Sequence, residues 1–356
     1  MIKSLTIAHF KSILQDTILL SNINVFIGEN GCGKTNILEA VAMLGAAKEP
    51  SFVIQNLANR GARITKPTLT LSSFKGQKTK NEILLSAQSD NELEIKRILA
   101  PNNLSDIYSD WSHQNKEFHP DKSAHYDLFQ QDLTHYLIFN LNTAALRGLT
   151  QSSLTVPLGI NGEGLDMLLH DFGKPEWLLL KKYSALISWL DEIIIDETDS
   201  LKFKGHKLGR SHSFLYFRDK YMRKDNNVFA AENSNEGVLH ILFYLALFIS
   251  PKTPSFFAID NIESSLNPQL CRVLMRTLSA IAVEQQKQVL ITTHNPAILD
   301  GLNLFDPHQR LYVVKRTDQG DTKTEPIVLK PTAPNRDFKL SELWMRGYLG
   351  GLPNHF

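Results

Sequence analysis

The stretch "GENGCGKTN" at 28–36 sets glycine, lysine and threonine at a spacing that can do chemistry. Gly28, Gly33, Lys34 and Thr35 match the pattern G-x-x-x-x-G-K-[ST]. In that pattern, backbone N–H groups surround phosphate oxygens, the lysine reaches the terminal phosphates and the hydroxyl faces Mg²⁺. We therefore predict a loop that binds the phosphates of a nucleotide with Mg²⁺. The residues expected to contact the nucleotide are Asn30, Gly31, Cys32, Gly33, Lys34, Thr35 and Asn36.

The segments on either side of this loop are those that the motif requires. "NINVFIG" precedes it, and this short apolar run is typical of a buried strand. "KTNILEAVAMLGAA" follows, with apolar residues at helical spacing, which predicts a helix over 34–46. A helix that begins at Lys34 directs the positive end of its dipole at the bound phosphates.

Two later strands end in residues that complete such a site. "SFFAIDNIESSLNP" contains an apolar run that ends at Asp260, whose carboxylate is expected to join Thr35 in holding Mg²⁺. "VLITTHNPAIL" contains a second apolar run that ends at His294. A lone histidine is more often structural, but its place after these two motifs favours a sensor of the γ-phosphate.

Composition excludes several classes of protein. The chain has 356 residues and a formal net charge of +1, so no general affinity for polyanions is implied and nucleic acid would need a local patch. The two cysteines, Cys32 and Cys271, indicate a reducing compartment without a disulfide framework. The longest apolar run, 238–249, is too short to cross a bilayer, and the first residues lack a signal sequence. We expect a cytoplasmic protein with no membrane segment.

The hydrophobic pattern predicts an α/β protein. Residues 64–98 hold short alternating segments that indicate an antiparallel sheet, and the polar residues 101–122 indicate an exposed loop. The other expected strands are 2–9, 16–20, 135–142, 255–260 and 288–293, followed by a hairpin at 310–330. The other expected helices are 161–171, 175–191, 236–249 and 267–285.

A basic stretch with interleaved aromatic residues lies at 199–224. It is compatible with a nucleic-acid surface, but a solvated hairpin whose aromatic side chains face the core gives the same pattern, and we favour the hairpin. The cations are Lys202, Lys204, Lys207, Arg210, Arg218, Lys220, Arg223 and Lys224.

The order of these motifs resembles that of the ATP-binding-cassette (ABC) ATPases, and within them the RecF, SMC and OLD-type proteins. The resemblance covers residues up to about 46 and from about 230 to 316. It implies a P-loop NTPase of ABC type, with a mixed central sheet flanked by helices, an antiparallel β subdomain and a helical insertion. The division we expect is an N-terminal ATPase lobe at 1–100, an insertion at 101–230, a C-terminal ATPase lobe at 231–330 and a tail at 331–356.

The resemblance also assigns site residues. "LTIAHFKSI" is similar to the first strand of these families and places Lys11 and Ser12 near the nucleotide. "NSNEG" resembles their signature motif, which approaches the γ-phosphate bound to the opposite subunit; its residues here are Ser234, Asn235, Glu236 and Gly237. Asn140 and Asn142 are the candidates for the equivalent of the glutamine loop of these families.

One position departs from the family pattern. The families place a glutamate directly after the strand aspartate as the general base, and this chain has Asn261 there. Glu263 matches a second acid of the OLD-type pattern. Three alternatives follow: Glu263 supports slow hydrolysis, the protein binds ATP with negligible hydrolysis, or Asn261 positions water while another residue is the base.

The resemblance implies an ATPase that forms an ATP-sandwich homodimer or a larger homo-oligomer. The sequence has no heptad repeat of the kind that forms an SMC-like arm. Too few residues follow His294 for an OLD-type nuclease domain. We expect a sensor subunit for a separately encoded effector, such as a nuclease or toxin, in bacterial anti-phage defence. The alternatives are a RecF-like DNA-binding ATPase in repair or replication, and a nucleotide-binding scaffold. The tail, with Trp344 and Tyr348, is expected either to dock a partner or to pack on the chain's own core.

Overall fold

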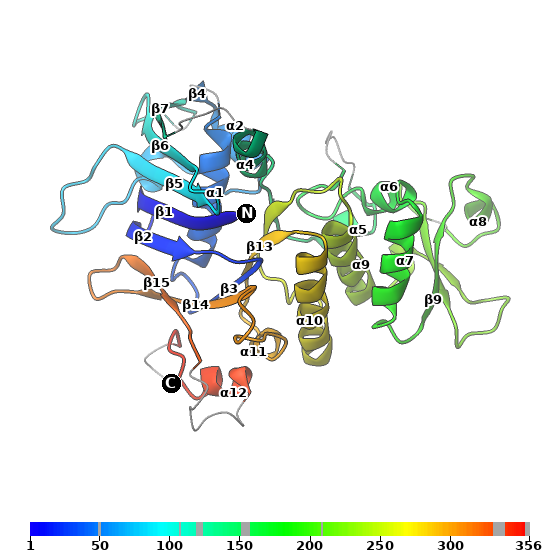
Figure 1. Ribbon diagram of the computed structural model, residues 1–356. Helices are drawn as coiled ribbons and strands as arrows, with labels where there is room; N and C mark the ends of the chain where they lie inside the picture. The colour runs from blue at the N-terminus through cyan, green and yellow to red at the C-terminus, as the bar shows by residue number, and fades with distance from the viewer. Residues whose placement is uncertain are drawn as a thin grey trace. The chain divides into compact units, whose positions relative to one another are not determined.

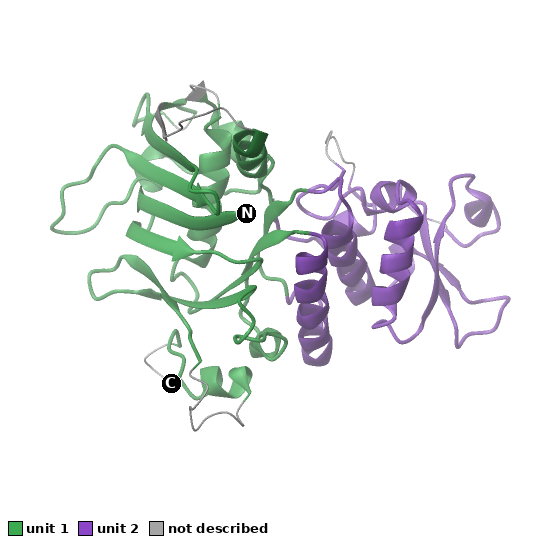
Figure 2. Cartoon of the chain, viewed as in Figure 1, with its two compact units in different colours: residues 1–138, 254–262, 286–356 green, residues 139–253, 263–285 purple. Residues whose placement is uncertain are grey.

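The computed structural model describes residues 1–48, 51–106, 108–118, 124–150, 157–207, 209–329 and 339–352 (Figure 1). The chain groups into two compact units (Figure 2). Unit 1 comprises residues 1–138, 254–262 and 286–356, and unit 2 comprises 139–253 and 263–285. Packing alone defines these units, so the four-part division expected above stays a prediction.

The first sheet of unit 1 is antiparallel throughout, as the alternating N-terminal segments predict. Its strand order is β2-β1-β5-β6-β7-β4. Its strands are β1 (Ile2–Phe10), β2 (Ile13–Leu19), β4 (Ser51–Phe52), β5 (Ile83–Ser89), β6 (Glu94–Pro101) and β7 (Trp111–Phe118).

The second sheet is mixed, with the order β15-β14-β3-β13-β12-β8. Neighbours from β14 to β12 are parallel, and β15 is antiparallel to β14. The strands are β3 (Ile23–Ile27), β8 (Ile138–Phe139), β12 (Phe256–Ile259), β13 (Gln288–Thr292), β14 (Gln309–Arg316) and β15 (Thr322–Pro326). Because the carboxyl ends of parallel strands share one edge, the residues after β3, β12 and β13 meet there.

Helix α1 (Lys34–Ala46) contacts strands of both sheets, namely β1 and β5 of the first and β13 of the second. All of its residues from Ile37 to Ala46 are buried, as expected for a helix with apolar side chains on every face. The remaining helices of unit 1 are α2 (Ile54–Ala58), α3 (Pro67–Thr70), α4 (Ala124–Thr134), α11 (Pro296–Leu299) and α12 (Leu340–Met345).

Unit 2 is organised around the buried helix α9 (Glu236–Ile249), which contacts four neighbouring helices. These are α5 (Thr143–Leu146), α6 (Leu165–His170), α7 (Lys174–Ser184) and α10 (Pro268–Glu284). A small sheet has the order β11-β10-β9. It contains β9 (Leu190–Ile195), β10 (Leu215–Asp219) and β11 (Val228–Ala230), and α8 (Ser200–Phe203) and the 3-10 turn η1 (Ala231–Asn233) complete the unit.

The structure contradicts several of the predicted loops, strands and helices. The loop expected at 101–122 contains β7, because Trp111 is buried and a long-range pairing with β6 forms the strand. The segment 68–74 starts in helix α3, since Pro67 favours a first helical turn. The strand expected at 135–142 forms only over β8, and the helix expected at 175–191 ends at Ser184 before β9 begins.

No helix among the described residues is both long and apolar enough to cross a bilayer. The most apolar one, α9, is instead the buried centre of unit 2.

One buried amide connects the two sheets of unit 1. The Gln288 side chain, on β13, accepts a hydrogen bond from the backbone N–H of Ile2 at 2.9 Å and donates to the Ile2 carbonyl at 2.7 Å. It also donates to the carbonyl of Ser21 at 3.0 Å. Removal of this amide leaves buried backbone groups of β1 without a partner.

We predict that Gln288→Ala lowers the free energy of unfolding by about 3 kcal/mol, because it removes three hydrogen bonds at a buried position. Chemical denaturation measures this change. The control is Gln269→Ala on the exposed side of α10, for which a change of about 0.5 kcal/mol or less is expected. Equal effects of the two substitutions would contradict the role of Gln288.

Candidate nucleotide-binding site

The phosphate loop joins β3 to α1 as predicted, and its glycines are needed for different reasons. Gly31 and Gly33 have φ of 78° and 113°, which favour glycine. At Gly33, a Cβ atom would also lie 2.3 Å from the Thr322 hydroxyl oxygen and 2.9 Å from that of Ser12. Gly33 is the N-cap of α1 and no side chain caps the helix, so the helix terminus faces the loop in the manner of an anion site.

Lys34 is buried in the loop as the motif predicts. Its Nζ donates hydrogen bonds to the carbonyls of Gly28 and Glu29, at 2.8 Å each. These carbonyls hold the ammonium group inside the curve of the loop, where phosphate oxygens are able to replace them as acceptors. The geometry therefore fits a nucleotide phosphate.

Asp260 follows β12 and lies next to Thr35, as expected from the parallel strand order. The Thr35 hydroxyl is 3.3 Å from one carboxylate oxygen of Asp260, and the Thr292 hydroxyl donates to the other at 2.5 Å. Among the described residues, no group of three or more His, Cys, Asp or Glu side chains surrounds a metal position. A hydroxyl beside one carboxylate suits Mg²⁺, which usually takes few protein oxygens and completes its shell with phosphate and water.

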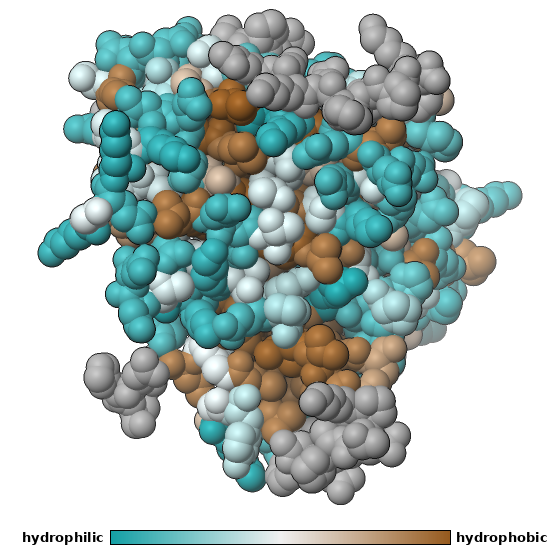
Figure 3. Space-filling view, turned by 60° about the vertical axis from the view of Figure 1, so that its left-hand side comes forward, coloured by the Kyte–Doolittle hydropathy of each residue, from teal (hydrophilic) through white to brown (hydrophobic). Residues whose placement is uncertain are grey.

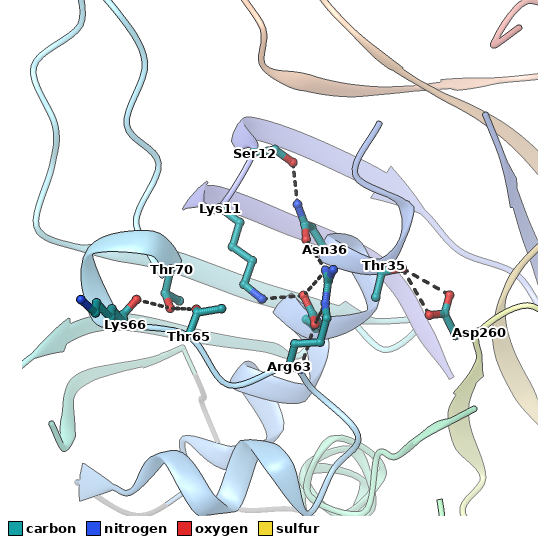
Figure 4. Close-up of polar contacts among 10 residues, drawn as sticks. Lys11, Ser12, Thr35, Asn36, Arg63, Thr65, Lys66, Thr70 and Asp260 are labelled. Carbon is teal, nitrogen blue, oxygen red and sulfur yellow. Dashed lines mark hydrogen bonds and ion pairs between the residues drawn. The ribbon is translucent and has the colours of Figure 1, made fainter. Parts of the chain in front are cut away.

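A buried carboxylate, Glu39, connects the start of α1 to two cations, Lys11 and Arg63. Figure 4 labels these two cations together with Asn36. The Lys11 Nζ lies 2.6 Å from one carboxylate oxygen, and the Arg63 Nε lies 2.7 Å from the other. Arg63 also donates to the side-chain oxygen of Asn36 at 2.9 Å. Sequence reasoning found Lys11 and Asn36 but missed Glu39 and Arg63. The available signal was the charged Glu39 within an otherwise apolar helix.

Burial raises the pKa of Glu39, but the hydrogen bonds and charges of Arg63 and Lys11 outweigh it, so the pKa lies below its ordinary value. Burial also lowers the pKa of Lys11, although Glu39 opposes that shift. Glu39 is therefore ionised at neutral pH. Removal of Lys11 or Arg63 would leave this buried charge with one partner fewer and destabilise the protein.

Ser12 is buried and supports the loop from the side of β15. Its hydroxyl accepts a hydrogen bond from the Asn36 amide at 2.7 Å and lies 2.7 Å from the Thr322 hydroxyl. Thr322 in turn donates to the carbonyl of Cys32 at 2.6 Å. Thr322, which sequence reasoning missed, therefore ties β15 to the loop. Direct contact of Ser12 with the nucleotide stays a prediction.

A pocket of about 420 Å³ adjoins the start of α1, a volume that suits part of a nucleotide. Lys11, Ser12 and Asn36, which the sequence predicts to contact the nucleotide, line this pocket together with Arg63. The other lining residues are Thr65, Thr68, Leu69, Leu71, Ser73, Phe74 and Arg316.

Asn30 and Gly31 are exposed at the tip of the loop, whereas Cys32 is buried. Burial raises the pKa of the Cys32 thiol, although Lys34 opposes the shift. A buried thiol with a raised pKa is poorly reactive, which favours a packing role for Cys32 over a redox role.

Asn261 and His294 follow the adjacent strands β12 and β13 in unit 1. Asn261 has a φ of 58°, in the left-handed region that asparagine adopts more readily than most residues, and its N–H donates to the Thr292 hydroxyl at 2.9 Å. Backbone conformation is thus one physical reason for asparagine here. His294 is exposed and directly precedes Asn295, the N-cap of α11.

Glu263 and the signature segment belong to unit 2. Burial and then the charge of Glu263 raise the pKa of Cys271 to about 11, which places the carboxylate near helix α10. Asn235 caps α9 by accepting from the Val238 N–H at 2.9 Å, and Glu236 accepts from the Ser265 hydroxyl at 3.0 Å.

Ser234 and Gly237 flank the N-cap of α9. The Ser234 side chain is buried, and its carbonyl accepts a hydrogen bond from Arg147 at 3.2 Å. Gly237 lies where a Cβ atom would be 3.4 Å from the Ser265 carbonyl. Asn142 caps α5, and the Asn140 N–H donates to Ile160, so both asparagines have local structural roles within unit 2.

The basic stretch at 199–224 includes cations already used in the fold. Lys207 is buried and donates to the Ser213 carbonyl at 2.6 Å, and Arg218 pairs with Glu192 at 2.9 Å. Tyr216 and Phe217 on β10 are buried, as the hairpin interpretation predicts, but Phe203 and Tyr221 are 82% and 74% exposed and Ser200–Phe203 forms helix α8. The hairpin interpretation is therefore correct only in part, and the role of this stretch stays a prediction.

Two family models match separate parts of the chain. One is described as an AAA ATPase domain and matches residues 1–144. The other is described as "AAA domain, putative AbiEii toxin, Type IV TA system" and matches residues 181–300. No curated protein matches the chain significantly.

Solved structures of SMC head domains resemble the chain over most of its length. The SMC head domain from Thermotoga maritima has a TM-score of 0.52 at 13% identity, with 92% of this chain and 99% of that chain covered. A second match is an SmcHead bound to the C-winged helix domain of ScpA, with a TM-score of 0.59 at 16% identity and 92% and 98% covered. A third, from Pyrococcus yayanosii, has a coiled coil and joint, with a TM-score of 0.55 at 9% identity and 98% and 99% covered.

The fold is that of an SMC head, an ABC-type P-loop ATPase fold. This confirms the expected fold class, and the two family models support an ATPase of the AAA and SMC-like type. The individual site residues stay predictions.

We predict that Asn261→Ala destabilises the protein by about 1 kcal/mol more than Asn261→Gly, because alanine is strained at a φ of 58° and glycine is not. Both variants lose the carboxamide group and differ only in the Cβ atom, so their difference in the free energy of unfolding reports the strain that a Cβ atom causes at this backbone conformation. Asn56→Ala, at an exposed position of α2, controls for the loss of an asparagine side chain. Equal stability of the two Asn261 variants would contradict the prediction.

We predict that Glu39→Gln lowers the free energy of unfolding by about 2 kcal/mol at neutral pH, because charged hydrogen bonds to Lys11 and Arg63 are lost. The pKa of Glu39 is lowered in the folded state, so this stability is complete above its ordinary value of 4.5. It is lost as the pH falls through the folded pKa.

Denaturation of the wild type and the variant across pH measures this. The difference should shrink below about pH 4.5. Glu82→Gln at an exposed position directly before β5 is the control, and its effect should stay small at every pH. A difference that persists at the lowest pH would contradict the assignment to Glu39.

Proposed function

We propose that this chain is an ATPase subunit that binds ATP with Mg²⁺ and forms a homodimer around it. The observation that carries the proposal is the phosphate loop, in which Lys34 is held by the Gly28 and Glu29 carbonyls beside the Thr35 and Asp260 pair. When bound, Mg²⁺ supplies charge neutralisation of the phosphates, and Thr35 and Asp260 are the residues suited to hold it. Lys11, Ser12, Asn36 and Arg63 bind the rest of the nucleotide in the adjoining pocket.

The proposed dimer rests on an ATP site that is divided between two segments of the chain, one from each subunit. In the proposed arrangement, the phosphate loop of one subunit faces the Ser234–Gly237 segment of the other. Asn235 fixes the start of the 14-residue helix α9, whose N terminus favours a negatively charged phosphate. Because both chains contact ATP only in the closed dimer, ATP shifts the population toward that state.

Hydrolysis is proposed to be slow. The amide side chain of Asn261 cannot accept a proton from water, and its backbone is in the left-handed region. Glu263, three positions after the candidate Mg²⁺ ligand Asp260, is the proposed base, with His294 as the γ-phosphate sensor. A slow cycle suits a switch, in which the lifetime of the closed dimer carries the signal.

A separately encoded effector, such as a nuclease or toxin, is the proposed recipient of this signal. The description of one matching family model names a putative AbiEii toxin of a type IV toxin–antitoxin system, which supports a role in bacterial anti-phage defence. Hydrophobic residues gather in the lower part of the view in Figure 3. Of the described tail residues, Leu343 and Trp344 are buried, whereas Met345 and Tyr348 are 60% and 70% exposed and are therefore accessible to a partner.

We predict that ATP with Mg²⁺ converts the wild type from monomer to dimer in mass photometry, and that Lys34→Ala abolishes this conversion. Lys34 is the phosphate-binding cation, so its loss removes the contact that favours the closed state. Lys48→Ala, exposed just after α1, is the matched control and should dimerise normally. Phosphate release from the same samples should be slow.

Other outcomes lead to other functions. An oligomer that ignores both ATP and Lys34 would contradict the switch. Rapid phosphate release would place an efficient base near the site and favour a hydrolytic motor. ATP-dependent binding of double-stranded DNA, lost on charge reversal at the exposed Lys204 and Lys224, would favour the RecF-like alternative.

A further inference from the structure

The C-terminal segment Leu340–Leu352 reaches back to the phosphate loop within unit 1. At Gly351, an added Cβ atom would lie 2.7 Å from a methyl carbon of Val313 and 3.3 Å from the Cα atom of Gly28. Gly28 is the first glycine of the phosphate-loop motif. The two glycines therefore pack backbone against backbone, a contact that no larger residue at 351 permits without movement.

Gly28 is also confined by β14. Its φ is 148°, and an added Cβ atom there would lie 2.1 Å from the Val314 carbonyl oxygen. The Gly28 backbone is thus close to both β14 and Gly351. Its own carbonyl accepts the hydrogen bond from Lys34 at 2.8 Å, so displacement of Gly28 moves an acceptor of the phosphate-binding ammonium group.

The other end of the segment is anchored near His294. The Ser341 N–H and hydroxyl donate to the Asp300 carboxylate at 3.0 and 2.9 Å. Asp300 is the C-cap of α11, the helix that follows His294 and Asn295. Leu340, Leu343 and Trp344 bury the apolar side of α12 and hold the segment in place.

We propose that Gly351 is a positioning residue for the phosphate loop, and that the segment Leu340–Leu352 couples this loop to helix α11 after His294. The proposal rests on the proposed function, since it assigns the segment to the same ATP site. A change at one end of the segment affects the other, because a short length of chain joins the anchors at Asp300 and Gly28.

The glycines of the segment supply a matched control. Gly347 and Gly351 have similar φ values of 79° and 71°, so alanine strains the backbone at both. A Cβ atom at Gly347 meets nothing within 4 Å, whereas one at Gly351 meets Val313 and Gly28. The two alanine variants therefore differ mainly in the contact with the phosphate loop.

The test is isothermal titration of ATP with Mg²⁺ into the full-length wild type, Gly351→Ala, Gly347→Ala and Lys34→Ala. Gly351→Ala should raise the Kd for ATP by about tenfold, the effect expected of an overpacked contact. Gly347→Ala should stay within about twofold of the wild type, with a Tm like that of Gly351→Ala. Unchanged affinity in Gly351→Ala, or an equal loss in Gly347→Ala, would overturn the proposal.

Hydrogen exchange of the wild type gives a readout that does not depend on the folding of a variant. Amides in residues 347–352 should exchange more slowly when ATP and Mg²⁺ are added, and Lys34→Ala should remove this protection. Exchange that ignores ATP, in a wild type that binds ATP, would overturn the coupling alone. A wild type whose ATP binding is absent or independent of Lys34 would instead overturn the proposed function, and this inference with it.

Discussion

The parallel pairing of β3, β13 and β12 is the constraint on which the rest of the site depends. Phe26 lies opposite Thr292, and Ile291 lies opposite Ile259, so the three strands end at one edge. The phosphate loop, the Asp260 carboxylate and His294 each follow one of these strands. A shift of register would move the Asp260 carboxylate away from Thr35 and separate the two candidate ligands of Mg²⁺.

Burial of helix α1 makes the position of the loop rigid. Since α1 contacts strands of both sheets, its first turn cannot rotate without disturbing two packed surfaces. The same packing buries the charged side chain of Glu39 on this helix, which is only 1% exposed. Lys11 and Arg63 compensate that charge, and they come from the turn after β1 and from the connection after α2, so the N-terminal sheet is tied electrostatically to the start of α1.

The site also relies on close backbone approaches that carry no charge. Gly33 is close to Thr322 and Ser12, and Gly28 is close to both Val314 and Gly351. The phosphate loop is therefore supported by β15 and by the C-terminal segment, both distant from it in the sequence. These supports give later parts of the chain a physical means to influence how the loop receives a phosphate.

The sequence by itself determined the phosphate loop, helix α1 and the acid-tipped strand, because each depends on local spacing and hydrophobic period. The fold class followed from the resemblance of the motif order to that of the ABC ATPases. The sequence did not predict β7, since that strand forms by long-range pairing and a polar segment carries no local signal for it. The partnership of Glu39 with Lys11 and Arg63, the support from Thr322 and the contact of Gly351 with Gly28 were decided only by the tertiary structure. Each joins residues far apart in the chain, and no period or motif records which distant residues will meet.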